Sequence, residues 1–270
     1  MVASSSIINQ YLCTSNAYGF HGPVYECTNC GLVFVVDNIS TKSILDNYDR
    51  AEDPIYVAEQ QARIQTFARH VHNLEKHHPK GKLLDVGAYT GLFLYQAKLA
   101  GWQVSGIEPS SWAVSQSKKL YGLDLKHGIF KSGSFPKNSF DVVTMWDVIE
   151  HFINPIDAIN IAYSYLSPGG VLAMSTIDVK SPVARILGKK WPWFMCMHRV
   201  YFSKETMIRA LKQAGFINIK YYPHIRYISL RYFLSRFSSL KLPFDDIIIP
   251  FYIGDLFDVY AQKSTSGDIF

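Results

Sequence analysis

The stretch Leu83-Leu84-Asp85-Val86-Gly87-Ala88-Tyr89-Thr90-Gly91 predicts an apolar strand that ends in a glycine turn, with a helix over Gly91–Ala100. Glycines let a backbone approach a ligand closely. The helix that follows directs its first amides and a partial positive charge toward an anionic group. We therefore expect Gly87 and Gly91 to form a binding turn for a nucleotide-like ligand.

Glu108 ends the second predicted strand, 21 residues after Gly87. A carboxylate at this place can accept hydrogen bonds from both hydroxyls of a ribose. Dinucleotide-binding proteins use the same acid, so Glu108 alone does not distinguish between adenosyl ligands. The nicotinamide fingerprint also needs a small residue one position beyond Gly91, where this chain has Leu92. That difference opposes a nicotinamide-dependent oxidoreductase, which is the nearest alternative in chemistry.

Predicted strands and helices alternate along most of the chain. The strands expected are Leu83–Val86, Gln103–Ile107, Asp141–Trp146, Val171–Thr176, Phe216–Tyr222 and Leu256–Gln262. The helices expected include Ile55–Leu74, Gly91–Ala100, Pro155–Leu166 and Ser203–Ala214. This alternation predicts an α/β fold with parallel strands and helices on both faces. An inserted amphipathic helix over Arg226–Leu240 interrupts it, because apolar residues there recur at helical spacing.

Five segments, in this order, resemble the class I S-adenosylmethionine-dependent methyltransferases, and the resemblance extends from Tyr48 to Lys263. The segments are Leu84–Gly91, Gly106–Ser110, Phe140–His151, Leu166–Gly170, and His198–Ser203 leading to Ala214–Phe216. The resemblance implies a Rossmann-like, doubly wound, seven-stranded and mostly parallel sheet with an antiparallel final strand. It also implies transfer of a methyl group from S-adenosylmethionine to oxygen, nitrogen or carbon of a small metabolite, such as an anionic sugar, a lipid or a quinone-type acceptor. A non-catalytic module that binds S-adenosylmethionine is an alternative from another class.

The resemblance also implies which residues hold the methyl donor. The glycine turn would shape its methionine end, Glu108 would hold its ribose, and Ile129 and Phe130 would lie against adenine. Tyr89 stands where relatives often have glycine, and its ring either narrows the pocket or packs against the donor. The expected donor-binding residues are Asp85, Gly87, Ala88, Tyr89, Gly91, Glu108, Pro109, Ile129, Phe130 and Trp146.

Acidic and imidazole side chains follow the fourth predicted strand, and the expected catalytic residues are Asp147, His151 and His198. If a helix begins near Asp147, then Glu150 and His151 project from one side of it, facing His198 from a later loop. In one interpretation these four residues bind a divalent metal, an arrangement similar to that of small-RNA 2′-O-methyltransferases and ubiquinone-pathway O-methyltransferases. In another, His151 or His198 acts as a metal-free base or hydrogen-bond donor. In a third, Glu150 and His151 only cap and orient the loop.

Histidines are also dense around the end of the helix expected over Ile55–Leu74, at His70, His72, His77 and His78. His70 and His72 should point to different sides of that helix. We therefore expect a solvated histidine-rich face there and not a metal site.

Residues 1–44 are predicted to form a polar, cysteine-bearing lead-in to a methyltransferase domain over residues 45–270. Cys27-Thr28-Asn29-Cys30 has the spacing of a zinc knuckle. Some members of the methyltransferase family begin with a two-knuckle zinc ribbon, and Cys13 aligns with one ligand of the other, incomplete pair. One expectation is zinc on Cys13, Cys27 and Cys30, with His21 as a further ligand; the other is a degenerate ribbon without metal.

Two insertions, over residues 180–200 and 224–250, are expected to cover an acceptor pocket as a lid. They carry Trp191-Pro192-Trp193-Phe194 and the arginines Arg226, Arg231 and Arg236, which suit an anionic small molecule. The excess of Lys and Arg over Asp and Glu is only +5, without a dense basic stripe, so no nucleic-acid partner is expected. The N-terminus lacks a secretory signal and the chain lacks a long apolar run, which favours a cytoplasmic protein whose only membrane contact would be peripheral.

Overall fold

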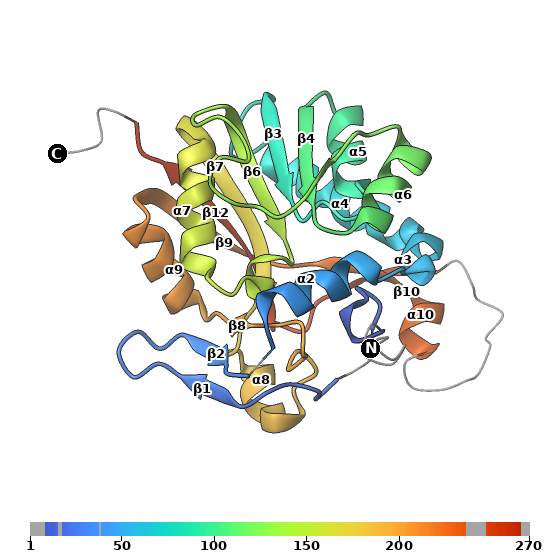
Figure 1. Cartoon of the computed structure of the whole chain (residues 1–270), viewed down its shortest axis with the longest axis vertical. Helices are drawn as coiled ribbons and strands as arrows, with labels where there is room; N and C mark the ends of the chain where they lie inside the picture. Colours follow the sequence, from blue (N-terminus) through green and yellow to red (C-terminus); the bar gives the residue numbers. More distant parts are fainter. Residues whose placement is uncertain (1–8, 16–17, 38, 236–246, 266–270) are drawn as a thin grey trace.

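The computed structural model describes residues 9–15, 18–37, 39–235 and 247–265 (Figure 1). Its strands are β1 (Val24–Glu26), β2 (Val33–Val35), β3 (Lys82–Val86), β4 (Gln103–Glu108), β5 (Lys126–His127), β6 (Phe140–Trp146), β7 (Leu166–Ile177), β8 (Val200–Tyr201), β9 (Phe216–Pro223), β10 (Arg226–Ser229), β11 (Ile248–Phe251) and β12 (Leu256–Lys263). Its helices are η1 (Asn9–Tyr11), α2 (Thr41–Arg50), α3 (Pro54–Ala58), α4 (Gln60–Leu74), α5 (Leu92–Leu99), α6 (Ser111–Tyr121), η2 (Ile149–His151), α7 (Pro155–Tyr165), α8 (Pro182–Leu187), η3 (Gly188–Lys190), α9 (Lys204–Gln213) and α10 (Leu230–Ser235).

A seven-stranded sheet forms the centre of the molecule, in the order β5-β4-β3-β6-β7-β12-β9. The strands from β5 to β7 are parallel to one another, whereas β12 is antiparallel to both of its neighbours, β7 and β9. The Rossmann-like, mostly parallel sheet with an antiparallel final strand is therefore confirmed.

Helices cover both faces of this sheet (Figure 1). One core lies between the sheet and α4 and α5, and includes Leu74, Leu83 and Phe93. The other core lies between the sheet and α7 and α9, and includes Met145, Ile159 and Met207. Because the central strands are buried on both faces, apolar residues occur on both of their faces instead of on alternate positions only. Polar side chains gather at their carboxyl ends, where helix cover stops.

The N-terminal hairpin β1–β2 joins the main body by pairing β2 with β8, so that Val33 lies opposite Tyr201. Farther toward the N-terminus, Tyr11 packs in a small apolar cluster with Ile44, Met195 and Met197. The lead-in thus lies against the loop before α9. The division of the chain at residue 44 stays a prediction.

Two helix predictions need correction. The helix expected over Ile55–Leu74 is two helices, α3 and α4, which meet at Glu59. The helix expected over Arg226–Leu240 begins as strand β10, which pairs with β11, and becomes helical only from Leu230. The local pattern of this segment did not contain its pairing partner β11, which lies about 20 residues downstream. Residues 236–246, Arg236 among them, lie outside the described residues. None of the described helices is long and apolar enough to cross a membrane.

Candidate active site

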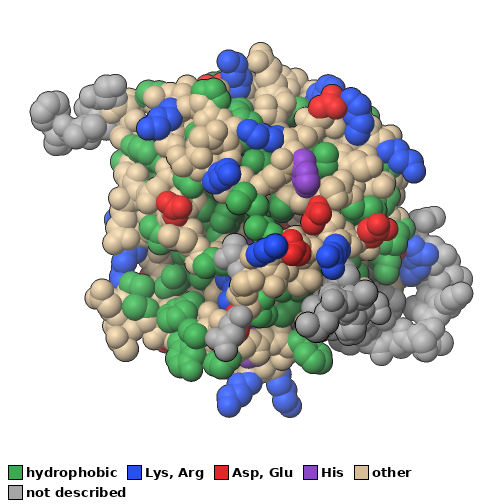
Figure 2. All heavy atoms as spheres, in the orientation of Figure 1, with side chains coloured by type: hydrophobic (Ala, Val, Ile, Leu, Met, Phe, Trp, Pro, Cys, Tyr) green, Lys and Arg blue, Asp and Glu red, His purple; other side chains and the backbone are tan. Residues whose placement is uncertain are grey.

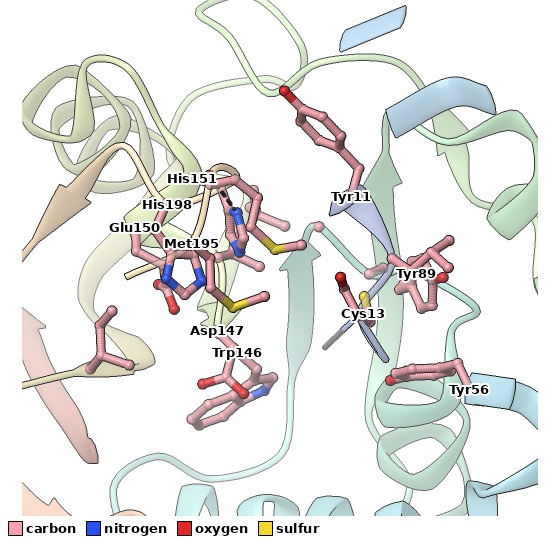
Figure 3. Close-up of a pocket in the computed structure, with 18 of the residues that line it drawn as sticks. Tyr11, Cys13, Tyr56, Tyr89, Trp146, Asp147, Glu150, His151, Met195 and His198 are labelled. Carbon is pink, nitrogen blue, oxygen red and sulfur yellow. Dashed lines mark hydrogen bonds between the residues drawn. The ribbon is translucent and has the colours of Figure 1, made fainter. Parts of the chain in front are cut away.

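A cavity of about 970 Å³ opens at the carboxyl ends of β3, β4 and β6. This is the upper end of the roughly 300–1,000 Å³ that ligand pockets occupy. The residues expected for the methyl donor, except Gly91, line one part of it, and those expected for catalysis line another. Figure 3 shows this division, with Tyr89 and Tyr56 on one side and Glu150, His151 and His198 on the other.

Glu108 ends β4 and is 4% exposed, with its carboxylate facing the cavity. One oxygen accepts the backbone N–H of Tyr89 and the other accepts that of Ser110, both at 2.9 Å. Burial raises the pKa of this carboxyl to about 7, although the two amides oppose the shift. Each oxygen keeps a further lone pair. The group therefore fits the two hydroxyls of a ribose without losing its own support.

The glycine turn is held as the sequence predicted. Gly87 has a φ of +69°, and a Cβ atom there would come within 2.7 Å of Val148. Asp85 accepts the hydroxyl of Thr144 at 2.6 Å, and burial raises the pKa of its carboxyl to about 8. Both Asp85 and Gly87 line the cavity. A carboxyl group beside an open glycine turn suits the amino acid end of the donor.

Tyr89 and Gly91 have different roles in the same turn. Tyr89 lies on the cavity wall, and its ring packs edge-on against Tyr56 with centroids 4.6 Å apart, so it narrows the pocket. Gly91 is not among the residues that line the cavity. Its φ of +79° starts α5, and a Cβ atom there would come within 2.5 Å of the Ser117 hydroxyl. Gly91 therefore shapes the turn through packing and not through a direct contact.

The remaining expected donor contacts all line the cavity: Ala88, Pro109, Ile129, Phe130 and Trp146. Ile129 is 42% exposed at the cavity edge. The indole of Trp146 is buried at the end of β6. This part of the wall is apolar, as expected for an adenine that is held by packing.

His198 is buried on the acceptor side of the cavity, and its Nδ1 lies 2.7 Å from the carbonyl oxygen of Trp193. Burial lowers the pKa of His198 to about 3, with a further contribution from His151. The ring is therefore neutral at pH 7. Because a carbonyl oxygen can only accept, Nδ1 carries the proton and Nε2 keeps its lone pair. This tautomer can accept a proton or bind a metal ion.

His151 ends the 3-10 helix η2 beside His198, and the two ring centroids are 5.0 Å apart. Its Nδ1 lies 2.7 Å from the Tyr48 hydroxyl and 3.1 Å from the Met197 carbonyl. Burial lowers the pKa of His151 to about 4. The expected helix from Asp147 is thus a short 3-10 turn, yet it still aims His151 toward His198.

The two nearby carboxyl groups differ in ionisation. Burial raises the pKa of Glu150 to about 8, and the charge of Asp147 adds to the rise. Burial also opposes ionisation of Asp147, but the charges of His224 and Arg226 outweigh it and lower its pKa. At pH 7 Glu150 is therefore mainly neutral and Asp147 is charged. Together the two carboxyl groups carry one negative charge.

Three of the four residues of the metal interpretation come together. One ligand atom from each of Glu150, His151 and His198 lies within 4.8 Å of the others. Asp147 is outside that group and instead accepts the hydroxyl of Ser175 at 2.7 Å. A divalent ion at this place would therefore have three protein ligands and not the four expected.

The predicted zinc set of Cys13, Cys27 and Cys30 is wrong. Cys27 and Cys30 form a tight turn between β1 and β2, closed by a 2.8 Å bond from the Gly31 amide to the Cys27 carbonyl. Cys13 lies on the cavity wall beside Tyr89 (Figure 3), where it is solvent-accessible through the cavity, and the protein surrounding it raises its thiol pKa to about 12. Within the described ranges, no group of three or more closely spaced ligand atoms contains these cysteines. The spacing of Cys27 and Cys30 predicted the turn, but among the described residues the fold does not bring to it the further ligands that a zinc ion needs.

The expectation of a solvated histidine-rich face is wrong for His70, whereas His72 is exposed on the other side of α4 as expected. His70 is 1% exposed and stacks on Trp146 with ring centroids 4.1 Å apart. His224 follows β9, lines the cavity and was not predicted as part of its wall, whereas Arg226, which was expected at the acceptor pocket, is the first residue of β10 and lines the cavity as well. The guanidinium of Arg226 lies 4.9 Å from the Trp193 ring centre, whereas Arg231 forms an ion pair with Glu59.

Comparisons with known proteins identify the family of the chain. A family described as a methyltransferase domain matches residues 57–221. The chain is 31% identical over 114 residues to the mitochondrial ubiquinone biosynthesis O-methyltransferase of Schizosaccharomyces pombe, which is 39% of this chain and 41% of that protein. It is 30% identical over 162 residues to the tRNA U34 carboxymethyltransferase of Desulfotalea psychrophila, or 54% of this chain and 49% of that protein. The chain thus spans about half the length of the curated relatives that it matches.

Solved structures share the fold. A methyltransferase from Thermotoga maritima, described as a possible histamine N-methyltransferase, aligns with a TM-score of 0.57 at 21% identity over 78% of this chain and 94% of that one. Phosphoethanolamine N-methyltransferase 2 of Haemonchus contortus, solved with S-adenosyl-L-methionine, aligns with a TM-score of 0.56 at 17% identity over 86% and 62%. At these identities the likeness extends to the fold alone.

Proposed function

The chain belongs to the methyltransferase-domain family and is an S-adenosylmethionine-dependent enzyme, and we propose that it methylates a small molecule whose accepting atom loses its proton to His198. The observation that carries the proposal is the neutral His198 ring, whose Nδ1 is held by the Trp193 carbonyl while Nε2 stays free to accept. It lies in the same cavity as Glu108.

The donor end of the cavity would bind the methyl donor and orient it. S-adenosylmethionine, when bound, supplies an electrophilic methyl group. Glu108 would accept hydrogen bonds from its ribose, and the open turn at Gly87 would admit its methionine part. Positioning of the two reactants provides most of the acceleration in such a transfer. We expect the methionine end of the donor to determine this positioning, whereas the ribose contact at Glu108 contributes mainly affinity.

The acceptor end of the cavity contains the groups that would take up the proton of the acceptor. His151 packs against His198, and Glu150 is fixed between them and the hydroxyl of Thr176. The negative charge of Asp147 faces this group and favours an imidazolium when His198 takes the acceptor's proton. A general base whose pKa lies near the working pH typically contributes about 10²–10⁴ in rate, so this role requires the pKa of His198 to rise from about 3 when the acceptor is bound beside it.

The shape of the cavity favours an amphipathic acceptor. Its wall beyond His198 includes Met195, Met197 and Phe152, whereas Asp147 and Arg226 supply charge. This supports a quinone-type or lipid-like molecule with one polar end. Arg226 is a candidate contact for an anionic group on such an acceptor.

The same three groups, Glu150, His151 and His198, also suit a divalent ion, and one substitution separates the two interpretations. At pH 7 Glu150 is mainly protonated, so Glu150→Gln replaces a neutral group with one of similar shape. A base mechanism through His198 should therefore keep kcat within a few-fold. A metal mechanism should lose most of its activity, because a carboxylate ligand is gone.

Nucleic acid is not the favoured acceptor, although one relative is named as a tRNA enzyme. On the face shown in Figure 2, Lys and Arg are scattered among Asp and Glu, without a continuous basic stripe over the described residues. Incubation with S-adenosylmethionine labelled in its methyl group, cell metabolites and total RNA tests this point. We expect label in the small-molecule fraction that is lost with His198→Ala. Label confined to RNA, or no label in either fraction, would contradict the proposal.

A further inference from the structure

A second cluster of buried polar side chains lies beneath α4 and consists of His70, His224 and Asp258. The three residues are 1%, 2% and 1% exposed. The Nδ1 atom of His224 lies 2.6 Å from one carboxylate oxygen of Asp258, and that of His70 lies 3.6 Å from the other. Helix α4, the end of β9 and strand β12 each contribute one member. The fold thus brings together three residues that are far apart in the sequence.

Packing alone does not account for this cluster. Nδ1 of His70 and Nε2 of His224 are buried without a hydrogen-bond partner among the described residues. A buried polar atom left without a partner costs about 1–3 kcal/mol. One carboxylate serves two imidazoles, and the two unpaired nitrogen atoms are themselves shielded from solvent although both rings line the cavity wall. An additional ligand would remove the cost at His70, the more weakly held of the two rings.

The chemistry of the cluster matches that of a transition-metal site. Two imidazoles and one carboxylate are a ligand set for divalent ions such as Zn²⁺ or Fe²⁺. Metal ions bind imidazole in its neutral form. In a tetrahedral zinc site with bonds of about 2.0–2.1 Å, neighbouring ligand atoms are about 3.3 Å apart. The two nitrogen–oxygen distances of 2.6 and 3.6 Å lie on either side of that value.

We infer that His70, His224 and Asp258 bind one divalent transition-metal ion in the wall of the cavity. His70 and His224 line the cavity, whereas Asp258 lies behind them. The open coordination position of the ion therefore faces the acceptor space. The charged Asp147, which both histidines influence electrostatically, is the carboxylate on that side. The inference does not depend on the proposed role of His198, because metal binding can be measured without donor or acceptor.

Cobalt is the appropriate probe, because Co²⁺ bound by histidine and carboxylate absorbs visible light. The full-length protein, stripped with a chelator, is titrated with Co²⁺ and separately with Zn²⁺. We expect one ion to bind, and its affinity to fall at least about 100-fold in His224→Gln and in Asp258→Asn, more than the roughly 10–100-fold of an outer-shell change. His198→Ala, from the other histidine group, is the matched control and should retain this ion.

Two results would overturn the inference. One is a wild-type protein that binds neither metal. The other is a metal affinity that is unchanged in both cluster variants. If the ion is lost in His198→Ala alone, it binds at the group of Glu150, His151 and His198 instead. Since buried substitutions can impair folding, a wild-type crystal soaked with Zn²⁺ gives an independent answer. Anomalous scattering at the zinc edge should peak between His70 and His224; a peak found only elsewhere contradicts the site.

Discussion

The donor end and the acceptor end of the cavity are built in different ways. At the donor end, Glu108 is held by amides of its own β4 loop and of the turn after β3, so neighbouring strand ends make the site. At the acceptor end, His151 contacts Tyr48, 103 residues away in the sequence, and His198 packs against the His151 ring. The donor end is therefore a local structure, whereas the acceptor end depends on the docking of distant segments.

Because of this difference, we expect the donor end to be common to related enzymes and the acceptor end to be particular to this chain. A strand, a glycine turn and an acid at the next strand end determine the donor geometry with few other contacts. The acceptor geometry needs the N-terminal segment as well. The ion pair between Arg199 and Asp37, with a 2.6 Å contact, attaches the loop of His198 to that segment. Substitutions at the two ends should therefore affect different measured quantities.

The largest effect is expected for His198→Ala. Removing the proton acceptor should lower kcat by about 10²–10⁴ and leave the affinity for S-adenosylhomocysteine unchanged. Steady-state kinetics and calorimetric titration measure the two quantities. The exposed His72, replaced by alanine, is the control. A parallel loss of donor affinity in His198→Ala would show that the two ends are not separable.

Glu108→Ala is the converse change. It removes two hydrogen bonds to a charged group, each worth about 1.5 kcal/mol, so the Kd for S-adenosylhomocysteine should rise about 100-fold. At saturating donor, kcat should stay near that of the wild type. Unchanged affinity would mean that Glu108 does not contact the donor.

Glu150→Gln tests the acceptor end through the pH dependence of the free energy of unfolding. Because the folded pKa of Glu150 is about 8, above its ordinary value, this group stabilises the fold at low pH and loses that contribution as pH rises toward 8. The buried histidines have lowered pKa values and act in the opposite sense, but only below about pH 6.5. Between pH 6.5 and 8, therefore, only the carboxyl groups contribute.

Urea unfolding at pH 6.5 and 8 measures this effect. The wild type should lose about 1–2 kcal/mol more over that interval than Glu150→Gln does. Glu52→Gln, at an exposed site, should behave like the wild type. An equal loss in wild type and Glu150→Gln would mean that the Glu150 carboxyl is already ionised in the fold at pH 6.5.

The smallest effect is expected for Tyr48→Phe. The substitution removes the 2.7 Å hydrogen bond to His151 and leaves the ring packing in place. A bond of this kind is worth about 0.5–1.5 kcal/mol, which corresponds to about a 2- to 10-fold loss of kcat. Tyr25→Phe on the N-terminal hairpin is the control. A kcat equal to that of the wild type would mean that the hydrogen bond from Tyr48 to His151 does not contribute to catalysis.

The sequence predicted the parts of the molecule that are local. The sheet and the donor turn follow from strands, glycines and one acid at fixed spacing, and both are found as expected. The strand β10 was predicted as helix because its pairing partner β11 is absent from the local pattern. His70 was assigned to a solvated face because nothing near it in the sequence shows that Trp146 and β12 cover it.

The role of the N-terminal segment was missed for the same reason. Its cysteines suggested a ribbon of its own, whereas Tyr11 packs in a cluster with Met195 and Met197. A useful signal was available in Tyr48, an aromatic residue at the start of the region of resemblance. Only the fold shows that it meets His151.

The most direct test of the account is a crystal structure of the protein with S-adenosylhomocysteine. We predict that both ribose hydroxyls donate to the carboxylate of Glu108, and that the sulfur points toward the space between Asp147 and His198. An adenosyl group bound with Glu108 untouched, or with its sulfur turned away from His198, would contradict the division of the cavity into a donor end and an acceptor end.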